Sequence, residues 1–364
     1  MGASSIEDDL PLTAIEWETR AAAALPSATF DYVAGGAGDE LTITENRAAF
    51  ERMRLVPRVM RARTRVTTET TLLGQPVAAP VMVAPFAYQG ALDEEGEVAT
   101  ARAAAALGVT MCLSTLSNRS MTDVAEACGD GPRWFQLYPL ADMAANHALV
   151  DEAASLGYQA VIVTVDLPPY GFREREIRNP FILPEGLDLP VVPPPPGGHG
   201  RPTPRETTGL MKWDLDWSDI GAIAAATDLP VIVKGILSPA DAVLAADHGA
   251  RAVIVSNHGG RQLDTTVAAI DALPAVAAVA RERFEVYMDG GVRRGVDVLK
   301  ALALGAHAVL VGRPVAWGLS VAGEAGVHRV LGQLVAETAN ALQLAGYQEP
   351  ARVGPEVLFR PIER

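Results

Sequence analysis

Eight short apolar runs recur along residues 81–311, separated by helix-like segments, and this alternation restricts the fold more than any other feature of the chain. Most runs are almost continuously apolar, which is typical of strands covered on both faces. The pattern predicts a closed parallel (β/α)8 barrel, with a doubly wound sheet as the alternative. The predicted strands are residues 81–84, 110–113, 134–137, 160–164, 231–234, 252–256, 285–288 and 308–311, and the helices between them include residues 97–106, 144–156, 240–247 and 295–304.

The chain is interpreted as one domain with three parts: a helical N-terminal extension (1–75), the barrel (76–345) and an insert after the fourth strand (175–213). Within the extension, residues 16–24 and 29–33 are predicted to be helical. The insert contains a Pro- and Gly-rich segment, residues 187–205, which is predicted to form neither a helix nor a central strand. The insert is therefore interpreted as a mobile lid, with a disordered surface segment as the alternative.

Composition excludes several classes of protein. The net charge of −14 argues against nucleic acid as a partner, because a polyanion requires a basic surface. The chain has two cysteines, Cys112 and Cys128, without metal-type spacing, so we expect no metal and no disulfide framework, and a cytoplasmic location fits. Residues 1–10 do not form a signal peptide, and no run of about 18 apolar residues predicts a membrane helix.

Polar residues follow every predicted strand after the first. In a (β/α)8 barrel, catalytic groups gather at the carboxyl ends of the strands, so these side chains should meet at one mouth. A His and an Arg three residues apart at such an end can accept a proton and bind a carboxylate, although such a pair on its own is more often structural. The residues at the strand ends are Ser114, Gln136, Tyr138, Thr164, Asp166, Lys234, Ser256, His258, Arg261, Asp289 and Arg313.

The seventh and eighth strand ends predict a phosphate site. The segment 289–295 contains Gly290, Gly291 and Arg293 and leads directly into a predicted helix, and Gly312-Arg313 follows the eighth strand. Glycine allows close approach of an anion to the backbone, a helix N-terminus presents N–H groups, and arginine adds charge. The alternative is two ordinary tight turns with surface arginines.

Together these motifs resemble the FMN-dependent 2-hydroxy acid oxidases and dehydrogenases, the family of glycolate oxidase, lactate oxidase and mandelate dehydrogenase. Residues 256–264 are similar to the family signature, and residues 289–295 to its phosphate loop. The similarity extends over residues 14–346 and also includes residues 30–32, 45–47, 135–138, 164–166, 233–235 and 312–314.

The resemblance implies roles for individual residues. His258 would be the base that accepts the substrate hydroxyl proton, and Asp166 would orient it. Arg173 and Arg261 would bind the substrate carboxylate, and Lys234 would lie beside N1 and O2 of the flavin. Further substrate contacts would come from Tyr32, Tyr138 and Leu116. The FMN would be held by Pro85, Phe86, Ala87, Ser114, Gln136, Thr164, Lys234, Ser256, Asp289, Gly291, Arg293, Gly312 and Arg313.

The substrate expected from this comparison is an (S)-2-hydroxy acid with an aromatic or bulky side chain, such as mandelate. Leu116 stands where glycolate oxidases carry an aromatic residue, and Phe86 replaces a common threonine, so the pocket is predicted to be larger and more apolar. The resemblance implies O2 or another electron acceptor and a homotetramer or octamer.

Three other functions stay open at this point. An FMN-dependent isomerase of the isopentenyl diphosphate type would need a metal and a diphosphate pocket, but not the His258–Arg261 pair. A Schiff-base aldolase would use Lys234 as its nucleophile. A flavin-binding protein without chemistry would keep its flavin oxidised in the presence of every hydroxy acid.

Overall fold

The computed structural model describes residues 10–61, 65–192, 203–280 and 283–359. Eight parallel strands close into a barrel in the order β10-β3-β4-β5-β6-β7-β8-β9, which confirms the predicted fold. Each predicted strand agrees with an observed one to within two residues at either end. The strands are β3 (Val81–Val83), β4 (Thr110–Ser114), β5 (Arg133–Leu137), β6 (Val161–Thr164), β7 (Val231–Ile236), β8 (Ala252–Val255), β9 (Glu285–Asp289) and β10 (Ala308–Val311).

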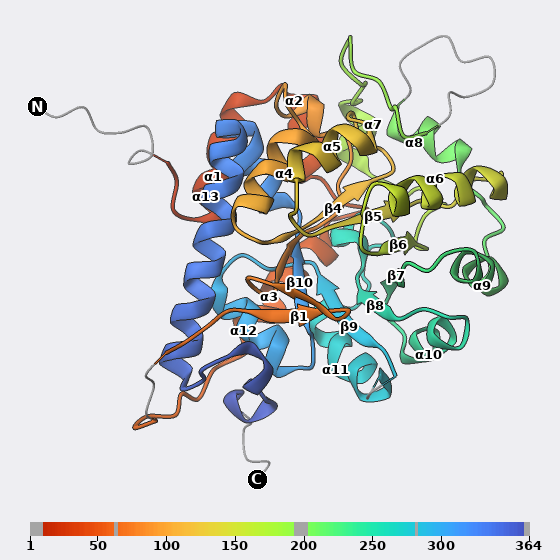
Figure 1. The fold of residues 1–364 in the computed structure, drawn as a ribbon. Coiled ribbons are helices and arrows are strands. Elements are labelled where there is room, and N and C mark those ends of the chain that lie inside the picture. The colour runs from red at the N-terminus through yellow and green to blue at the C-terminus, as the bar shows by residue number, and fades with distance from the viewer. Residues whose placement is uncertain (1–9, 62–64, 193–202, 281–282, 360–364) are drawn as a thin grey trace, which may run out of the picture.

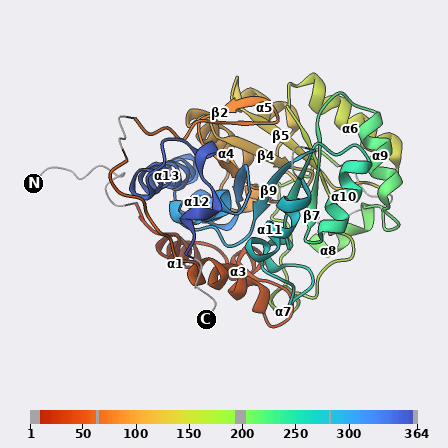
Figure 2. The ribbon, with the colours of Figure 1, turned by 90° about the horizontal axis from the view of Figure 1, so that it is seen from below.

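A ring of helices surrounds the strands, as Figure 2 shows. Local sequence starts several of them: the Ser120 hydroxyl accepts the backbone N–H of Asp123, and the Asp123 carboxylate caps Ser120 in return. The helices of the ring are α4 (Glu97–Ala106), α5 (Met121–Cys128), α6 (Met143–Ser155), α9 (Trp217–Ala225), α10 (Pro239–Asp247), α11 (Ala269–Ala280), α12 (Gly295–Ala303) and α13 (Arg313–Ala345).

Alternation along the strands decides which side chains enter the barrel. One face of the strands forms a single buried cluster that includes Met82, Cys112, Trp134, Ile162, Ile232, Ile254, Tyr287 and Leu310. Side chains two positions apart in a strand share a face. Interior positions at the carboxyl ends are therefore occupied by Ser114, Gln136, Thr164, Lys234, Ser256 and Asp289, all of which were predicted to hold the flavin.

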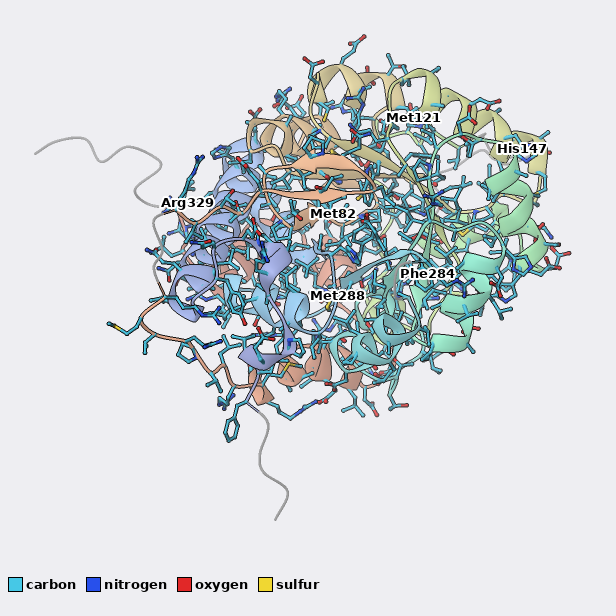
Figure 3. All side chains as sticks on the ribbon, turned by 60° about the horizontal axis from the view of Figure 1, so that its bottom comes forward. Met82, Met121, His147, Phe284, Met288 and Arg329 are labelled. Carbon is cyan, nitrogen blue, oxygen red and sulfur yellow. The ribbon has the colours of Figure 1, made fainter. Side chains whose placement is uncertain are left out.

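The opposite end of the barrel is closed by a hairpin that the sequence did not predict. Strands β1 (Thr70–Leu72) and β2 (Gln75–Val77) pair antiparallel, and Leu72 and Val77 belong to the interior cluster. The backbone N–H of Leu73 donates to the Glu285 carboxylate at 3.0 Å. Figure 3 views this end, with Met82 close to the hairpin.

The N-terminal extension forms α1 (Ala14–Ala24), α2 (Ser27–Ala34) and α3 (Leu41–Arg52), so both predicted helices are confirmed and α3 is an addition. Helix α1 packs on α13, and α3 packs on α11 and on the short turn that contains His258. Helix α2 lies against α7 (Glu174–Arg178) at the end of the barrel where the strands terminate (Figure 1).

The insert contains α7, α8 (Pro204–Thr207) and a 3₁₀ turn over Thr208–Leu210. The four consecutive prolines at 193–196 lie outside the described residues. Helix α8 begins inside the segment 187–205 that was predicted to lack helix, so that prediction was wrong at its end. Proline at the first helical position costs no hydrogen bond, and Thr203 caps the helix together with Glu206.

Neither a membrane-spanning helix nor a metal-binding cluster is found among the described residues. No helix among them has both the length and the apolar character needed to cross a membrane. In the same part of the chain, no three His, Cys, Asp or Glu side chains are grouped in a way that could hold a metal ion.

Candidate active site

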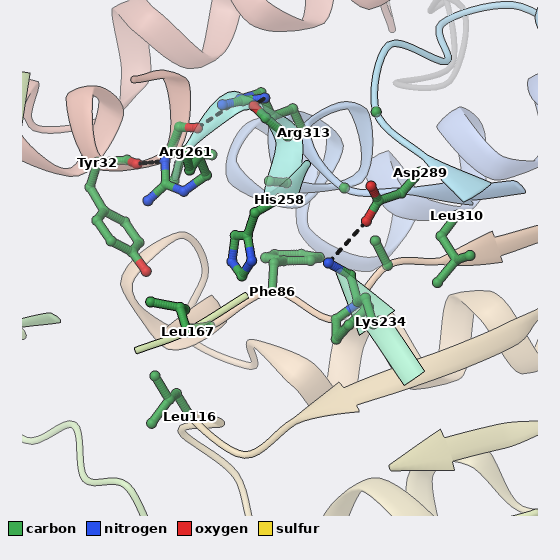
Figure 4. A pocket seen from close by; sticks show the side chains of 18 of the residues that line it. Tyr32, Phe86, Leu116, Leu167, Lys234, His258, Arg261, Asp289, Leu310 and Arg313 are labelled. Carbon is green, nitrogen blue, oxygen red and sulfur yellow. Dashed lines mark hydrogen bonds and ion pairs between the residues drawn. The ribbon is translucent and has the colours of Figure 1, made fainter. Parts of the chain in front are cut away.

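A cavity opens at the carboxyl ends of the strands, and residues at or after all eight ends contribute to its lining. Figure 4 shows His258, Lys234 and Asp289 on one side of it and the apolar side chains Leu116 and Leu167 on another. Helix α2 adds Tyr32, and the last part of the insert adds Pro204, Thr208 and Met211.

His258 and Asp166 form a largely buried pair just after β8 and β6. Nδ1 of His258 lies 2.9 Å from Oδ1 of Asp166, so Nδ1 carries the proton and Nε2 is left as an acceptor. Burial lowers the pKa of His258, the charges of Lys234 and Arg173 lower it further, and Asp166 opposes them. Burial acts to raise the pKa of Asp166, but His258 and Lys234 bring it below its ordinary value. The pair is therefore a neutral imidazole beside a carboxylate.

Two arginines lie beside this pair. Arg173 donates from Nε to the backbone oxygen of Arg261 at 2.9 Å, and Arg261 donates from Nη1 to the backbone oxygens of Tyr32 and Gly35. Both line the cavity, and their side chains are only 3% and 14% exposed. Both also bind the carboxylate of Glu176, at 3.2 Å in each case. Sequence reasoning missed Glu176, because it lies in the charged run 173–178, which resembles a solvated helix face.

Tyr32 and Tyr138 reach the cavity from α2 and from the end of β5. Tyr32 stacks on Phe181 with ring centroids 4.6 Å apart, and the Arg261 guanidinium lies 4.9 Å from the centre of the Tyr32 ring. Burial raises the pKa of both phenols, so each keeps its hydroxyl proton and can donate a hydrogen bond.

Lys234 is a buried cation at the end of β7, with 4% of its surface exposed. Its Nζ lies 3.1 Å from Oδ2 of Asp289 and donates to Oγ of Ser256 at 3.0 Å. Burial acts to lower the pKa of Lys234, but Asp289 and Asp166 raise it above the ordinary lysine value. Lys234 is therefore charged at neutral pH.

The apolar part of the lining is larger than predicted. Phe86 and Leu116 were expected there, and the structure adds Leu167, Pro204 and Met211. Met211 and Leu140 form an isolated antiparallel bridge, which joins the last part of the insert to the segment after β5. The sequence held no signal for these three residues, because none of them lies in a barrel strand or directly at the end of one.

The predicted phosphate site has the charge and shape that an anion requires. Burial lowers the pKa of Arg313 to about 9 and that of Arg293 to about 10, and neighbouring arginines contribute to both shifts. The Arg313 side chain donates to three backbone oxygens, those of Val33, Gly259 and Gly35, and none of these is charged. Buried cations in this state favour a bound anion.

Glycine is required beside these arginines. Gly291 has a φ of +86°, and a Cβ atom there would come within 2.0 Å of the backbone oxygen of Asn46. The loop leads to the N-terminus of α12, and α13 begins at Arg313 itself. Both helix ends can direct N–H groups at a phosphate, so the site fits the phosphate of FMN.

Among the interior residues at the carboxyl ends of the strands, three buried polar atoms have no hydrogen-bond partner within the described residues: Nε2 of Gln136, Oγ1 of Thr164 and Oδ1 of Asp289. Unpaired buried groups are costly and call for a partner. All three are at interior positions, so they fit the polar edge of a flavin ring.

The structure brings together nearly all of the predicted site residues. Those that line the cavity are Tyr32, Pro85, Phe86, Ala87, Leu116, Tyr138, Arg173, Lys234, His258, Arg261, Asp289, Gly291, Arg293, Gly312 and Arg313. Five others are not part of the cavity lining in the described structure and lie behind it, namely Ser114, Gln136, Thr164, Asp166 and Ser256.

Comparison with known proteins agrees with this geometry. A family model described as FMN-dependent dehydrogenase matches residues 21–360. An L-lactate oxidase from a Nostoc species is 45% identical over 92% of this chain and 94% of its own length. A 4-hydroxymandelate oxidase from Amycolatopsis orientalis is 45% identical over 88% of this chain and 91% of its own length.

Solved structures of mandelate oxidase also match this chain over most of its length. Mandelate oxidase with benzoyl-formic acid has a TM-score of 0.88 and 41% identity, and the match covers 96% of this chain and 98% of that one. Mandelate oxidase with (S)-2-phenylpropionate gives the same TM-score and the same identity.

Proposed function

This chain belongs to the family of FMN-dependent dehydrogenases, with FMN as its cofactor, and we propose that its substrate is an (S)-2-hydroxy acid with an aromatic or bulky side chain, such as mandelate. Its reaction class is the oxidation of 2-hydroxy acids. The observation that carries the substrate proposal is that a largely buried base and two largely buried arginines share one cavity with the apolar side chains of Phe86, Leu116, Leu167, Pro204 and Met211. The relatives named after mandelate and 4-hydroxymandelate support it.

We assign the base to His258. Its Nε2 would accept the proton of the substrate hydroxyl, and Asp166 would hold the ring and stabilise the imidazolium that forms. A base whose pKa is suited to neutral pH contributes about 10²- to 10⁴-fold to the rate. When bound, FMN supplies the acceptor for the two electrons and the C2 hydrogen.

The other residues orient the substrate. Arg173 and Arg261 would bind its carboxylate, and Tyr138 and Tyr32 would donate hydrogen bonds to its oxygens. Holding both the carboxylate and the hydroxyl of the substrate fixes the position of its C2–H bond. The reaction then takes place within a bound complex and does not depend on a random encounter.

The FMN site would extend along the strand ends. Arg293, Gly291, Gly312 and Arg313 would hold the phosphate. Lys234 would lie at the polar edge of the ring. The remaining contacts would come from Pro85, Phe86, Ala87, Ser114, Gln136, Thr164, Ser256 and Asp289.

The alternative functions are not favoured. The matching family model is described as FMN-dependent dehydrogenase and the relatives are named oxidases, which argues against an isomerase of the isopentenyl diphosphate type. An aldolase that uses Lys234 would need a lysine of lowered pKa, whereas Asp289 raises the pKa of Lys234.

Anaerobic addition of mandelate, lactate and glycolate to the yellow holoenzyme tests the proposal. Mandelate should bleach the flavin bands fastest, and a clear preference for glycolate would reject the substrate class. We propose O2 as the acceptor, since the relatives are named oxidases, and readmitted air should restore the colour. A single domain, a cytoplasmic location and a tetramer or octamer are also proposed, and light scattering after size exclusion tests the assembly.

A further inference from the structure

Glu176 is a largely buried acid in the site region, and the proposed reaction does not use it. Its side chain is 10% exposed and comes from α7, in the insert. One oxygen, Oε1, lies 3.2 Å from Nη1 of Arg173 and 3.2 Å from Nη2 of Arg261. A single carboxylate oxygen therefore joins the two arginines that face the cavity.

The second oxygen of this carboxylate is held as well. Oε2 accepts the hydroxyl of Tyr170 at 2.5 Å, and the Arg173 guanidinium lies 3.9 Å from the centre of the Tyr170 ring. Tyr170 lines the cavity, as do both arginines, whereas Glu176 is not part of its lining among the described residues. Glu176 thus binds the arginines from behind and does not reach a ligand in the cavity.

The charge balance follows from these contacts. Two buried guanidinium groups and one carboxylate leave the cluster with a net charge of +1. One substrate carboxylate then neutralises the cluster. Without Glu176, the two cations would repel each other, and a ligand carboxylate would meet both charges unopposed.

We propose that Glu176 is a positioning residue that acts through the two arginines: its carboxylate offsets one of their two charges and so limits their affinity for the carboxylate of the substrate and of the product. This inference rests on the proposed function, in which the arginines bind that carboxylate. A moderate affinity favours turnover, because the 2-oxo acid product carries the same carboxylate and must leave.

The test compares Glu176→Gln and Glu176→Asp with the wild-type holoenzyme. Glutamine keeps the shape and removes the charge, whereas aspartate keeps the charge and is one methylene shorter. Glu174→Gln is the matched control, because Glu174 lies on the same helix and pairs only with the surface residue Arg178 among the interactions that the structure shows. The probe is benzoylformate, a 2-oxo acid, and its Kd is measured by isothermal titration calorimetry.

We expect Glu176→Gln to lower the Kd by about tenfold, whereas Glu176→Asp, which keeps the charge, and Glu174→Gln should leave the Kd close to the wild-type value. KM should fall in parallel with the Kd, while kcat changes less than KM. Replacing a residue with only a structural role would raise the Kd for benzoylformate. A lower Kd therefore distinguishes the proposed role from a structural one.

An unchanged or higher Kd in Glu176→Gln would overturn the proposal, and Glu176→Ala, which also removes the charge, gives the answer if the glutamine variant fails to fold. The outcome is separate from that of the proposed function. If benzoylformate binds as expected but no hydroxy acid bleaches the flavin, the reaction fails and the assignment of Glu176 stands.

Discussion

Nδ1 of His258 lies 2.9 Å from Oδ1 of Asp166, and the two residues come from strand ends that are 92 positions apart in the chain. The contact fixes which nitrogen of the imidazole faces the cavity. His258 has a φ of 56°, so its backbone is in the left-handed region, which histidine adopts only when the surrounding structure requires it.

The first prediction concerns the pH dependence of flavin reduction. The base must be neutral, and burial together with Lys234 and Arg173 lowers the pKa of His258 below 6.5. The rate should therefore stay high below pH 6.5 and fall only as the pH drops through this lowered value. Anaerobic stopped-flow measurement of the flavin reduction rate across a pH series locates this fall. A reduction rate that already falls as the pH drops from above 6.5 would contradict the assignment of His258 as the base.

The second prediction is the effect of Asp166→Asn. The change removes the anion that raises the pKa of His258, so the acidic limb should move to still lower pH. At the same time, the reduction rate should fall by about 10²- to 10⁴-fold, because the imidazolium loses its counter-ion. Asp123→Asn, at the cap of α5, is the control and should leave the rate unchanged.

The third prediction concerns the buried pair of Lys234 and Asp289. Asp289→Asn leaves the lysine charge unpaired, so the free energy of unfolding should fall by about 3 to 5 kcal/mol. The pKa of Lys234 is raised in the folded state, so the stability that this group contributes is complete below the ordinary lysine value and is lost as the pH rises through the folded value.

Urea unfolding of the apoprotein at pH 7 measures this loss, with the exposed Asp247→Asn as the control. A change of less than about 1 kcal/mol would mean that the pair contributes no more than a surface ion pair.

The fourth prediction concerns the phosphate site. Arg313→Gln should weaken FMN binding by about 10- to 100-fold, as expected for the loss of charge-assisted hydrogen bonds. Arg294→Gln should have little effect, because Arg294 is half-exposed and pairs with Glu337. Fluorescence titration of the apoprotein with FMN gives both constants.

An Arg313→Gln variant that binds FMN as tightly as the wild-type protein would reject a role for this arginine in the phosphate site.

The fifth prediction concerns the size of the substrate. Leu116→Trp reduces the space beside Phe86 and Leu167, so kcat/KM should fall for mandelate far more than for glycolate. If the ratio of kcat/KM for mandelate to kcat/KM for glycolate does not change, the mandelate ring does not reach the side chain at position 116.

The sequence predicted those parts of the molecule that depend on short-range patterns. The barrel strands were found because their runs are apolar, and their ends carry most of the site. Helix α3 was missed because Leu41–Arg52 mixes threonines with charged residues and has a weak apolar face. The β1–β2 hairpin was missed because each of its strands has only three residues.

Glu176 shows why part of the site could not be predicted from the sequence. Its neighbours along the chain, Glu174 and Arg175, are at least partly exposed, and one charged residue in such a run is not distinguished by type or spacing. It becomes special only because Arg261, 85 positions away, is folded against it. Contacts of this kind depend on tertiary structure.

Parts of the N-terminal extension lie at both ends of the barrel. Tyr32 and Asn46 stand at the flavin end, where the side-chain amides of Asn46 and Asn257 form two reciprocal hydrogen bonds of 2.9 and 2.8 Å. The hairpin of residues 70–77 fills the other end. The extension therefore completes the barrel at both ends. A shortened chain that begins at β3 would lose the hairpin that closes one end of the barrel and, at the other end, the residues that the extension contributes to the active site.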